Sequence, residues 1–138
     1  NNTDGIQKTD RTRDASLSCH TNSCIGLWNR EHVFAQSLAT PSFDTSFPSA
    51  GTDVHNLRAS DSQMNSSRSN RLFAFGNGVS SVTSEGDFFP GDEWKGDVAR
   101  IIMYMYLRYP TQCIPNNVAK GQHTYSNDIP DILLTWNI

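Results

Sequence analysis

Apolar side chains recur with helical spacing in one stretch of the chain, 92-DEWKGDVARIIMYMYLRY-109. Its apolar positions are separated by three and four residues, which places them on one face of an α-helix. Acidic residues start the stretch, a basic residue lies near its end and a proline follows it, as suits a helix and its dipole. We expect residues 92–109 to form the main core helix, with an apolar stripe of Val98, Ile101, Ile102, Met105 and Tyr109.

Shorter patterns predict two strands and two further helical segments. The apolar runs at residues 25–34 and 54–57 suit strands. Residues 60–70 begin with a Ser-Asp pair that can cap a helix, although the Ser and Asn content is poor for one. Such a weak helix is better explained as a scaffold for polar side chains than as a stabilising element. Residues 131–136 predict one or two final helical turns.

The remaining segments are predicted to be irregular. They are a polar arm at residues 1–18, loops at 37–52 and 111–128, and a loop or marginal hairpin at 76–91. At 138 residues we expect one α+β domain, and no run approaches the length of a membrane span. Because the chain starts without Met and shows no apolar targeting segment, we expect a processed mature chain or a fragment of a longer one.

The net charge of −3 is unevenly distributed. Residues 1–84 carry equal numbers of acidic and basic side chains, whereas residues 85–138 carry the whole net negative charge. An acidic total argues weakly against a nucleic-acid partner, which usually meets a basic surface. Six of the eight arginines lie in the first half, near the polar motifs described below, so local charge weighs more than the total.

Three cysteines bear on the redox environment. Cys19 and Cys24 bracket a short polar loop, 19-CHTNSC-24, which suits a small disulfide in a secreted or periplasmic protein. Cys113 is then either free or paired with one of the other two. The alternative is a zinc site made of these cysteines and His20, but the spacing lacks the paired short loops of most zinc sites. We expect the Cys19–Cys24 disulfide and an oxidising compartment.

Polar residues without an evident packing role fall in three clusters, on the two predicted strands and the weak helix. A hairpin with a helix folded across it would bring them together. Their carboxylate and amide oxygens suit a single hard cation such as Mg²⁺, because no thiolate is involved. A histidine beside such a cation, rather than bound to it, can take a proton from water. The clusters are Arg30-Glu31-His32, Asp53-His55-Asn56 and Asn65-Arg68-Asn70.

Each of these residues also has a simpler explanation. Glu31 and His32 are neighbours on a strand and point to opposite faces unless the strand bends or ends there. His55 can be a core histidine satisfied by a backbone carbonyl, and Asn65 can be a capping or turn residue. The arginines can be solvated surface. The joint arrangement of the three clusters favours a functional site, with the strand bending or ending at Glu31 and His32.

Three segments that carry these residues resemble the endonuclease I family of secreted and periplasmic nucleases, within the ββα-metal (His–Asn–His-like) superfamily. They are 28-WNREHVFAQS-37, 52-TDVHNLRASDSQMNSSRSN-70 and 95-KGDVARIIMYMYLRY-109. The three motifs agree in order and with compatible gaps over residues 16–109. The resemblance implies a ββα-metal nuclease core, a two-stranded antiparallel hairpin plus a helix, packed with additional helices.

The resemblance also implies roles for single residues. His32 matches the family's general base, which deprotonates the attacking water, and Asn56 matches the asparagine that steadies the loop and ring of that base. Glu31 and Asn65 match the protein ligands of one catalytic Mg²⁺, a site open also to Mn²⁺ or Ca²⁺. Arg68 stands in the family's N-x-x-R-x-N pattern, where we expect a structural or phosphate-facing role. The family's scissile-phosphate arginine is not placed by the motifs, and the candidates are Arg30, Arg58 and Arg68.

From these implications we expect a metal-dependent, largely sequence-nonspecific endonuclease that acts on DNA and RNA as a monomer and leaves 5′-phosphate and 3′-OH ends. Two other classes are a non-catalytic nucleic-acid-binding module and a metal-dependent phosphodiesterase for small substrates. The joint presence of Glu31, His32 and Asn65 argues against the first. The chain departs from the family after residues 133–136, where many relatives continue, and cysteine number varies among relatives.

Overall fold

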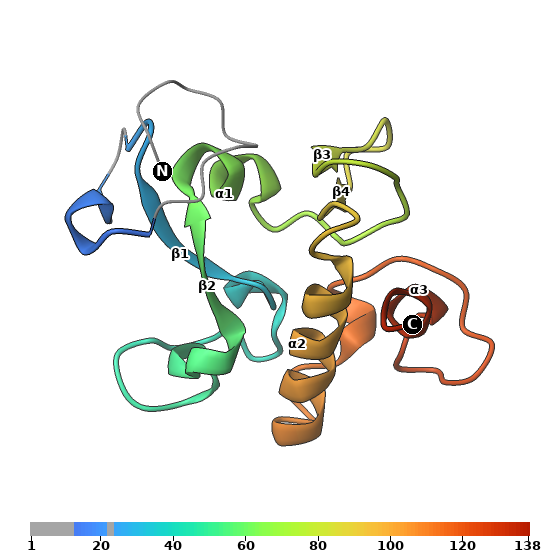
Figure 1. The fold of residues 1–138 in the computed structure, drawn as a ribbon. Helices are drawn as coiled ribbons and strands as arrows, with labels where there is room; N and C mark the ends of the chain where they lie inside the picture. Colours follow the sequence, from blue (N-terminus) through green and yellow to red (C-terminus); the bar gives the residue numbers. More distant parts are fainter. Residues whose placement is uncertain (1–12, 22–23) are drawn as a thin grey trace.

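The computed structural model of the chain describes residues 13–21 and 24–138. It has an α+β fold, as expected, and its first half contains a ββα unit. Strands β1 (Trp28–His32) and β2 (Leu57–Asp61) pair antiparallel, with Trp28 opposite Asp61 and His32 opposite Leu57. Helix α1 (Ser62–Arg68) follows β2 directly. Figure 1 shows this hairpin on one side of the molecule, with α1 across the end of β2.

The second strand lies further along the chain than the sequence pattern predicts. Residues Val54–Asn56, expected to open a strand, form the 3₁₀ turn η5, and β2 begins at Leu57. The cause is local, because the Asp53 carboxylate accepts a hydrogen bond from the backbone N–H of His55 and caps the turn. The prediction of a strand at residues 54–57 was therefore wrong in its position.

The other two elements of the ββα unit are shorter than predicted. Strand β1 begins after a turn in which Leu27 N donates to Cys24 O, with Gly26 at φ 76°. Helix α1 begins at Ser62 and is capped by Asp61, whose side chain accepts from the backbone N–H groups of Gln63 and Met64, so the expected cap within the Ser-Asp pair is confirmed. The helix ends at Ser69, which adopts φ 50°.

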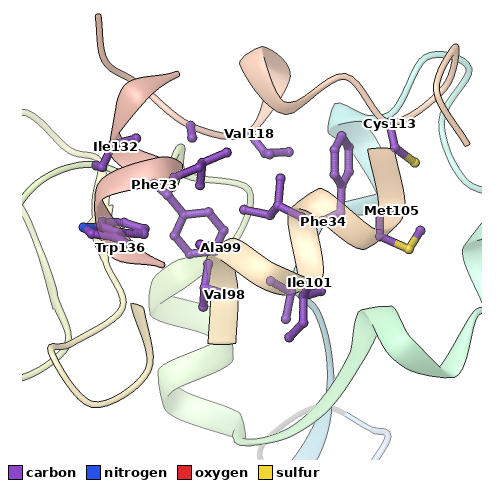
Figure 2. Packing of buried hydrophobic residues seen from close by; sticks show 14 of the residues in the cluster. Phe34, Phe73, Val98, Ala99, Ile101, Met105, Cys113, Val118, Ile132 and Trp136 are labelled. Atoms are coloured by element: carbon purple, nitrogen blue, oxygen red, sulfur yellow. The ribbon is translucent and has the colours of Figure 1, made fainter. Parts of the chain in front are cut away.

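Helix α2 (Lys95–Arg108) forms the centre of the core. Its predicted apolar stripe is buried at Val98, Ile101, Ile102 and Met105. Helix α3 (Asp131–Trp136) packs against it and buries Ile132, Leu133 and Trp136. Figure 2 shows Phe73, which follows α1, beside Trp136 of α3, and Phe34, which follows β1, on the side of the cluster near Met105 of α2. The core therefore ties the site-bearing hairpin to α2. The helix starts three residues later than predicted, and Asp92 instead accepts from Gly78 N.

The remaining segments contain little regular structure. The expected marginal hairpin forms from β3 (Ser81–Val82) and β4 (Phe88–Phe89). Short 3₁₀ turns interrupt the predicted arm and loops at η2 (Ala15–Leu17), η3 (Gln36–Leu38), η4 (Ala50–Thr52) and η6 (Pro115–Asn117). The first twelve residues of the predicted arm lie outside the described residues. No helix within residues 13–21 and 24–138 is long and apolar enough to cross a membrane.

The predicted disulfide between Cys19 and Cys24 is confirmed. Cys19 and Cys24 are bonded, and Cys113 is a buried free thiol. The zinc alternative is wrong, because two of its proposed ligands are bonded to each other. Across the described ranges, no group of three or more His, Cys, Asp or Glu side chains could hold a metal ion.

Candidate active site

The end of the β1–β2 hairpin and helix α1 enclose an open hollow of about 390 Å³, here called the polar hollow. Residues of β1, of the turn that follows β1, and of α1 meet around this hollow. The strand ends at His32, as expected, so that Glu31 and His32 both line the hollow. Its lining is Arg30, Glu31, His32, Ala35, Gln36, Ser37, Asn65, Arg68, Ser69 and Asn70.

The imidazole of His32 is held by hydrogen bonds at both nitrogens. Its Nε2 lies 2.8 Å from the carbonyl oxygen of Gly51, and its Nδ1 lies 3.2 Å from the side-chain nitrogen of Gln36. Since a carbonyl oxygen can only accept, Nε2 carries the proton and the lone pair of the neutral ring is on Nδ1. Burial lowers the pKa of His32, the bond to Gly51 opposes this, and the charge of Arg30 lowers it further. The ring is therefore neutral near pH 7, with its basic nitrogen toward the hollow.

The carbonyl that orients His32 belongs to a glycine in a crowded position. A Cβ added at Gly51 would lie 2.9 Å from the Cβ of Phe43 and would meet the backbone of Asp44. The 3₁₀ turn around Gly51 is closed by reciprocal hydrogen bonds between Ser49 and Thr52. The missing side chain thus lets the backbone approach closely, and the turn fixes the carbonyl toward the imidazole. Sequence reasoning missed this residue, because a backbone acceptor leaves no residue-type signal.

Glu31 and Arg68 form a buried ion pair with 2.8 Å between Oε1 and Nη1. The side chains are 14% and 4% exposed. Burial raises the pKa of Glu31 to about 7, while the charge and hydrogen bond of Arg68 oppose the increase. Burial likewise lowers the pKa of Arg68, opposed by Glu31. A carboxylate with so little water around it gains from any further cation that can reach it.

Arg68 also fixes the backbone where β1 ends. It donates to the carbonyl oxygens of His32 at 3.0 Å and Val33 at 2.8 Å, and its guanidinium lies 4.6 Å from the centre of the Phe73 ring. These contacts account for the departure of the chain from the strand after His32. Of the two roles expected for Arg68, structural or phosphate-facing, these contacts fit the structural role.

Asn65 projects from α1 toward β1. Its Nδ2 donates to Asn29 Oδ1 at 2.7 Å and to the carbonyl oxygen of Arg30 at 3.2 Å. The amide nitrogen is therefore committed to the strand, and Oδ1 is the atom suited to a cation. The side chain bridges two elements, so the simpler explanation of Asn65 as a capping or turn residue is wrong. Its oxygen and the Glu31 carboxylate suit Mg²⁺, which keeps several waters and needs few protein ligands.

Asn56 is fully buried and clamps the turn that follows His32. Its Oδ1 accepts from the backbone N–H of Phe34 at 2.7 Å, and its Nδ2 donates to the Phe34 carbonyl at 3.0 Å. Asn56 therefore steadies the loop that follows His32, while the imidazole ring itself is held by Gly51. It also lies at the end of η5 rather than on the second strand.

His55 is a surface residue, so its explanation as a core histidine is wrong. Its side chain is 65% exposed, lies 4.6 Å from the Tyr104 ring centre and contacts Asp53. Asp53 also accepts from the hydroxyls of Tyr104 at 3.1 Å and Tyr109 at 2.9 Å. Burial raises the pKa of Asp53, but hydrogen bonds from His55 and the two tyrosines bring it below its ordinary value. This carboxylate anchors the segment between Gly51 and Asn56 to α2.

The three candidate arginines for a phosphate contact have different surroundings. Arg30 is exposed and lines the polar hollow with His32. Arg58 donates to the Leu57 carbonyl at 2.8 Å and lines a second cavity of about 210 Å³ between the hairpin and α2, which shares Glu31, Asn65 and Arg68 with the polar hollow. Arg68 is buried, as described above. Several other cations are paired with carboxylates: Lys95 with Asp92, Arg100 with Asp97, Arg108 with Asp53 and Lys120 with Asp87.

The chain is similar to a known protein family and to two extracellular ribonucleases. The family model for Endonuclease I matches residues 2–138. An extracellular ribonuclease of Bacillus amyloliquefaciens is 35% identical over 138 residues, covering 91% of this chain and 46% of that protein. An extracellular ribonuclease of Bacillus subtilis (strain 168) is 38% identical over 141 residues, covering 94% of this chain and 46% of that protein. The chain thus spans about half the length of these curated relatives, and it belongs to the endonuclease I family.

Proposed function

We propose that this domain is a metal-dependent endonuclease that hydrolyses phosphodiester bonds of DNA and RNA with little sequence preference. The observation that carries the proposal is the convergence of the His32 lone pair, the Glu31 carboxylate and the Asn65 amide on one polar hollow. Family membership supports it, as do the two relatives named extracellular ribonucleases. Those names and the disulfide also support a secreted protein.

His32 acts as the general base in this proposal. Its Nδ1 takes a proton from a water molecule as the water oxygen attacks phosphorus, and the P–O3′ bond breaks. The leaving 3′ oxygen takes a proton from solvent water, so the products are a 5′-phosphate and a 3′-hydroxyl. The Gly51 carbonyl keeps the ring oriented and stabilises the imidazolium that forms, because its bond to Nε2–H strengthens when the ring is charged.

Glu31 and Asn65 would hold one Mg²⁺, with Mn²⁺ or Ca²⁺ as alternative occupants. An ion held there would stabilise the negative charge that develops on the phosphate and on the leaving oxygen. Glu31 contributes the negative charge of the site, and Asn65 contributes a neutral oxygen whose direction is set by its bonds to β1. Arg68 keeps Glu31 in place through the buried ion pair.

Arg30 is our choice for the arginine that contacts the phosphate. It is exposed, it lines the hollow beside His32, and in the described part of the chain it is not paired with a carboxylate. Arg58 lies on the neighbouring strand and would bind a flanking phosphate of the same backbone. Contacts of this kind attract nucleic acid without reading its sequence.

A plasmid-nicking assay tests the proposal directly. Supercoiled DNA and a structured RNA are incubated with the protein in Mg²⁺ or in excess EDTA, beside His32→Ala and the matched control His123→Ala, whose histidine is exposed on a distant loop. In Mg²⁺, we expect the unsubstituted protein and His123→Ala to cleave both nucleic acids. We expect no cleavage by His32→Ala or in EDTA. Binding without cleavage would indicate a nucleic-acid-binding module, and hydrolysis of small diesters alone would indicate a phosphodiesterase.

A further inference from the structure

We propose that Gln36 is a catalytic residue whose side-chain amide exchanges partners during the reaction. In the free protein it donates to His32 Nδ1, and in the substrate complex it donates to a non-bridging oxygen of the scissile phosphate. The inference rests on the nuclease function proposed above. It adds a residue that neither the resemblance nor the comparisons assign.

The backbone of Gln36 is fixed while its side chain is free to rotate. Gln36 is the first residue of η3, it follows the buried Ala35, and its carbonyl accepts from Phe43 N at 3.1 Å. The side chain itself is exposed and lines the polar hollow. A change of side-chain torsions can therefore move the amide without disturbing the loop that holds His32.

The contact with His32 has a defined direction. Because Nε2 carries the proton toward Gly51, Nδ1 has a lone pair and can only accept. The group 3.2 Å away must be the NH₂ of Gln36, since the amide oxygen would face that lone pair without a hydrogen between them. The basic nitrogen of the site is therefore covered by an amide donor when no substrate is present.

The amide and the attacking water compete for the same atom. Nδ1 has one lone pair, and a water must donate to that lone pair before it can lose its proton to His32. The Gln36 amide has to leave when the water enters. Because it starts 3.2 Å from Nδ1, it remains beside the water and the phosphorus that the water attacks. Reacting atoms approach to about 3–3.5 Å, so a non-bridging phosphate oxygen falls within reach of the displaced NH₂.

The displaced amide complements the other groups in the hollow. Glu31 and Asn65 offer only oxygens, which repel the phosphate unless a cation lies between them. Gln36 offers a neutral donor on the side of the base and adds to the charge of Arg30. Such a donor stabilises charge that develops on phosphate oxygens in the transition state without itself changing protonation. No covalent step passes through Gln36.

Single-turnover cleavage of a labelled oligonucleotide in Mg²⁺ tests the exchange. We expect Gln36→Ala to lower the cleavage rate at saturating protein by about 10–100-fold, somewhat below the loss typical of a preorganised oxyanion donor because the side chain is exposed. Mg²⁺ affinity by calorimetry and Tm should stay unchanged. Gln36→Lys, which keeps a donor of similar reach, should recover most of the rate. Gln112→Ala is the matched control, since that glutamine is half-buried, its side chain donates to the carbonyl of Pro41, and it is not among the residues that line the polar hollow.

A phosphorothioate at the scissile position distinguishes substrate contact from a structural role. Replacing the oxygen that Gln36 contacts with sulfur, a weaker acceptor, should slow the unsubstituted protein more than it slows Gln36→Ala. If Gln36→Ala cleaves as fast as the unsubstituted protein or faster, the amide only covers the base and the inference is wrong. Equal sulfur effects in the two proteins would also overturn it. If the unsubstituted protein does not cleave at all, the nuclease function fails and takes this inference with it.

Discussion

The buried carboxylate of Glu31 should make the stability of the cation-free protein depend on pH. Burial raises its pKa to about 7 from the ordinary value of 4.5. The folded chain therefore binds the proton more tightly than the unfolded chain, and folding takes up a proton between these two pH values. The free energy of unfolding falls as pH rises through this range, and the loss is complete above pH 7.

The size of the effect follows from the two pKa values. They differ by about 2.5 (7 − 4.5), and each pKa unit corresponds to about 1.4 kcal/mol, so the full effect is about 3 kcal/mol. Glu31→Gln resembles the protonated side chain and lacks the titration. Relative to this variant, the unsubstituted protein should lose about 2–3 kcal/mol of stability between pH 5 and pH 8.

Urea unfolding in EDTA at several pH values measures the difference between the two proteins. Glu85→Gln serves as the control for the loss of one carboxylate, because that side chain is 77% exposed. Adding Mg²⁺ should stabilise the unsubstituted protein more at pH 8 than at pH 6, because the ion and the proton compete for one carboxylate. A difference between the unsubstituted protein and Glu31→Gln that stays constant from pH 5 to pH 8 would refute the reasoning.

Four further predictions concern His32, the Asp53 anchor and the cysteines. Burial and the charge of Arg30 lower the pKa of His32, so at saturating Mg²⁺ single-turnover cleavage should persist below about pH 6.5, the ordinary value for an imidazole, and fall only at lower pH. Equal rates at pH 4.5 and pH 8 would contradict the role of His32. Asp53→Asn should destabilise the protein by about 2–3 kcal/mol, because it removes the charge from a carboxylate that accepts several hydrogen bonds. Urea unfolding measures this loss, and an unchanged midpoint would show that Asp53 does not anchor the segment to α2. Replacing Cys19 and Cys24 by serine should cost about 2 kcal/mol for so short a loop, again by urea unfolding. Burial raises the pKa of Cys113 to about 12, so its thiol should react with a thiol reagent only after unfolding.

The sequence predicts the elements that rest on side-chain periodicity and capping. The apolar stripe of α2 is buried where its spacing places it, and Asp61 begins α1 as its position before the helix indicates. The pairing of Glu31 with His32 at the end of a strand also follows, because neighbours on a strand can share one site only where the strand ends or bends.

The features that were missed depend on backbone groups or on contacts between distant residues. The Val54–Asn56 segment has the length and composition of a strand end, but a capping bond from Asp53 to His55 N turns it into a 3₁₀ turn. The carbonyl that orients His32 comes from Gly51, nineteen residues further along the chain. The packing of His55 on Tyr104 joins parts of the chain that no local pattern connects. Such contacts depend on tertiary structure, for which short-range sequence patterns carry little information.

Single-turnover cleavage measured beside a calorimetric Mg²⁺ titration tests the central claim most directly, with His32→Ala, Glu31→Ala and Asn65→Ala compared in one experiment. His32→Ala should bind Mg²⁺ and nucleic acid as the unsubstituted protein does but cleave about 10²–10⁴-fold more slowly. Glu31→Ala should lose Mg²⁺ affinity and recover part of its activity at high Mg²⁺. Asn65→Ala should show a milder loss of the same kind, because it removes a neutral ligand. If His32→Ala loses the metal while Glu31→Ala keeps it, the two roles are exchanged and the account of this site is wrong.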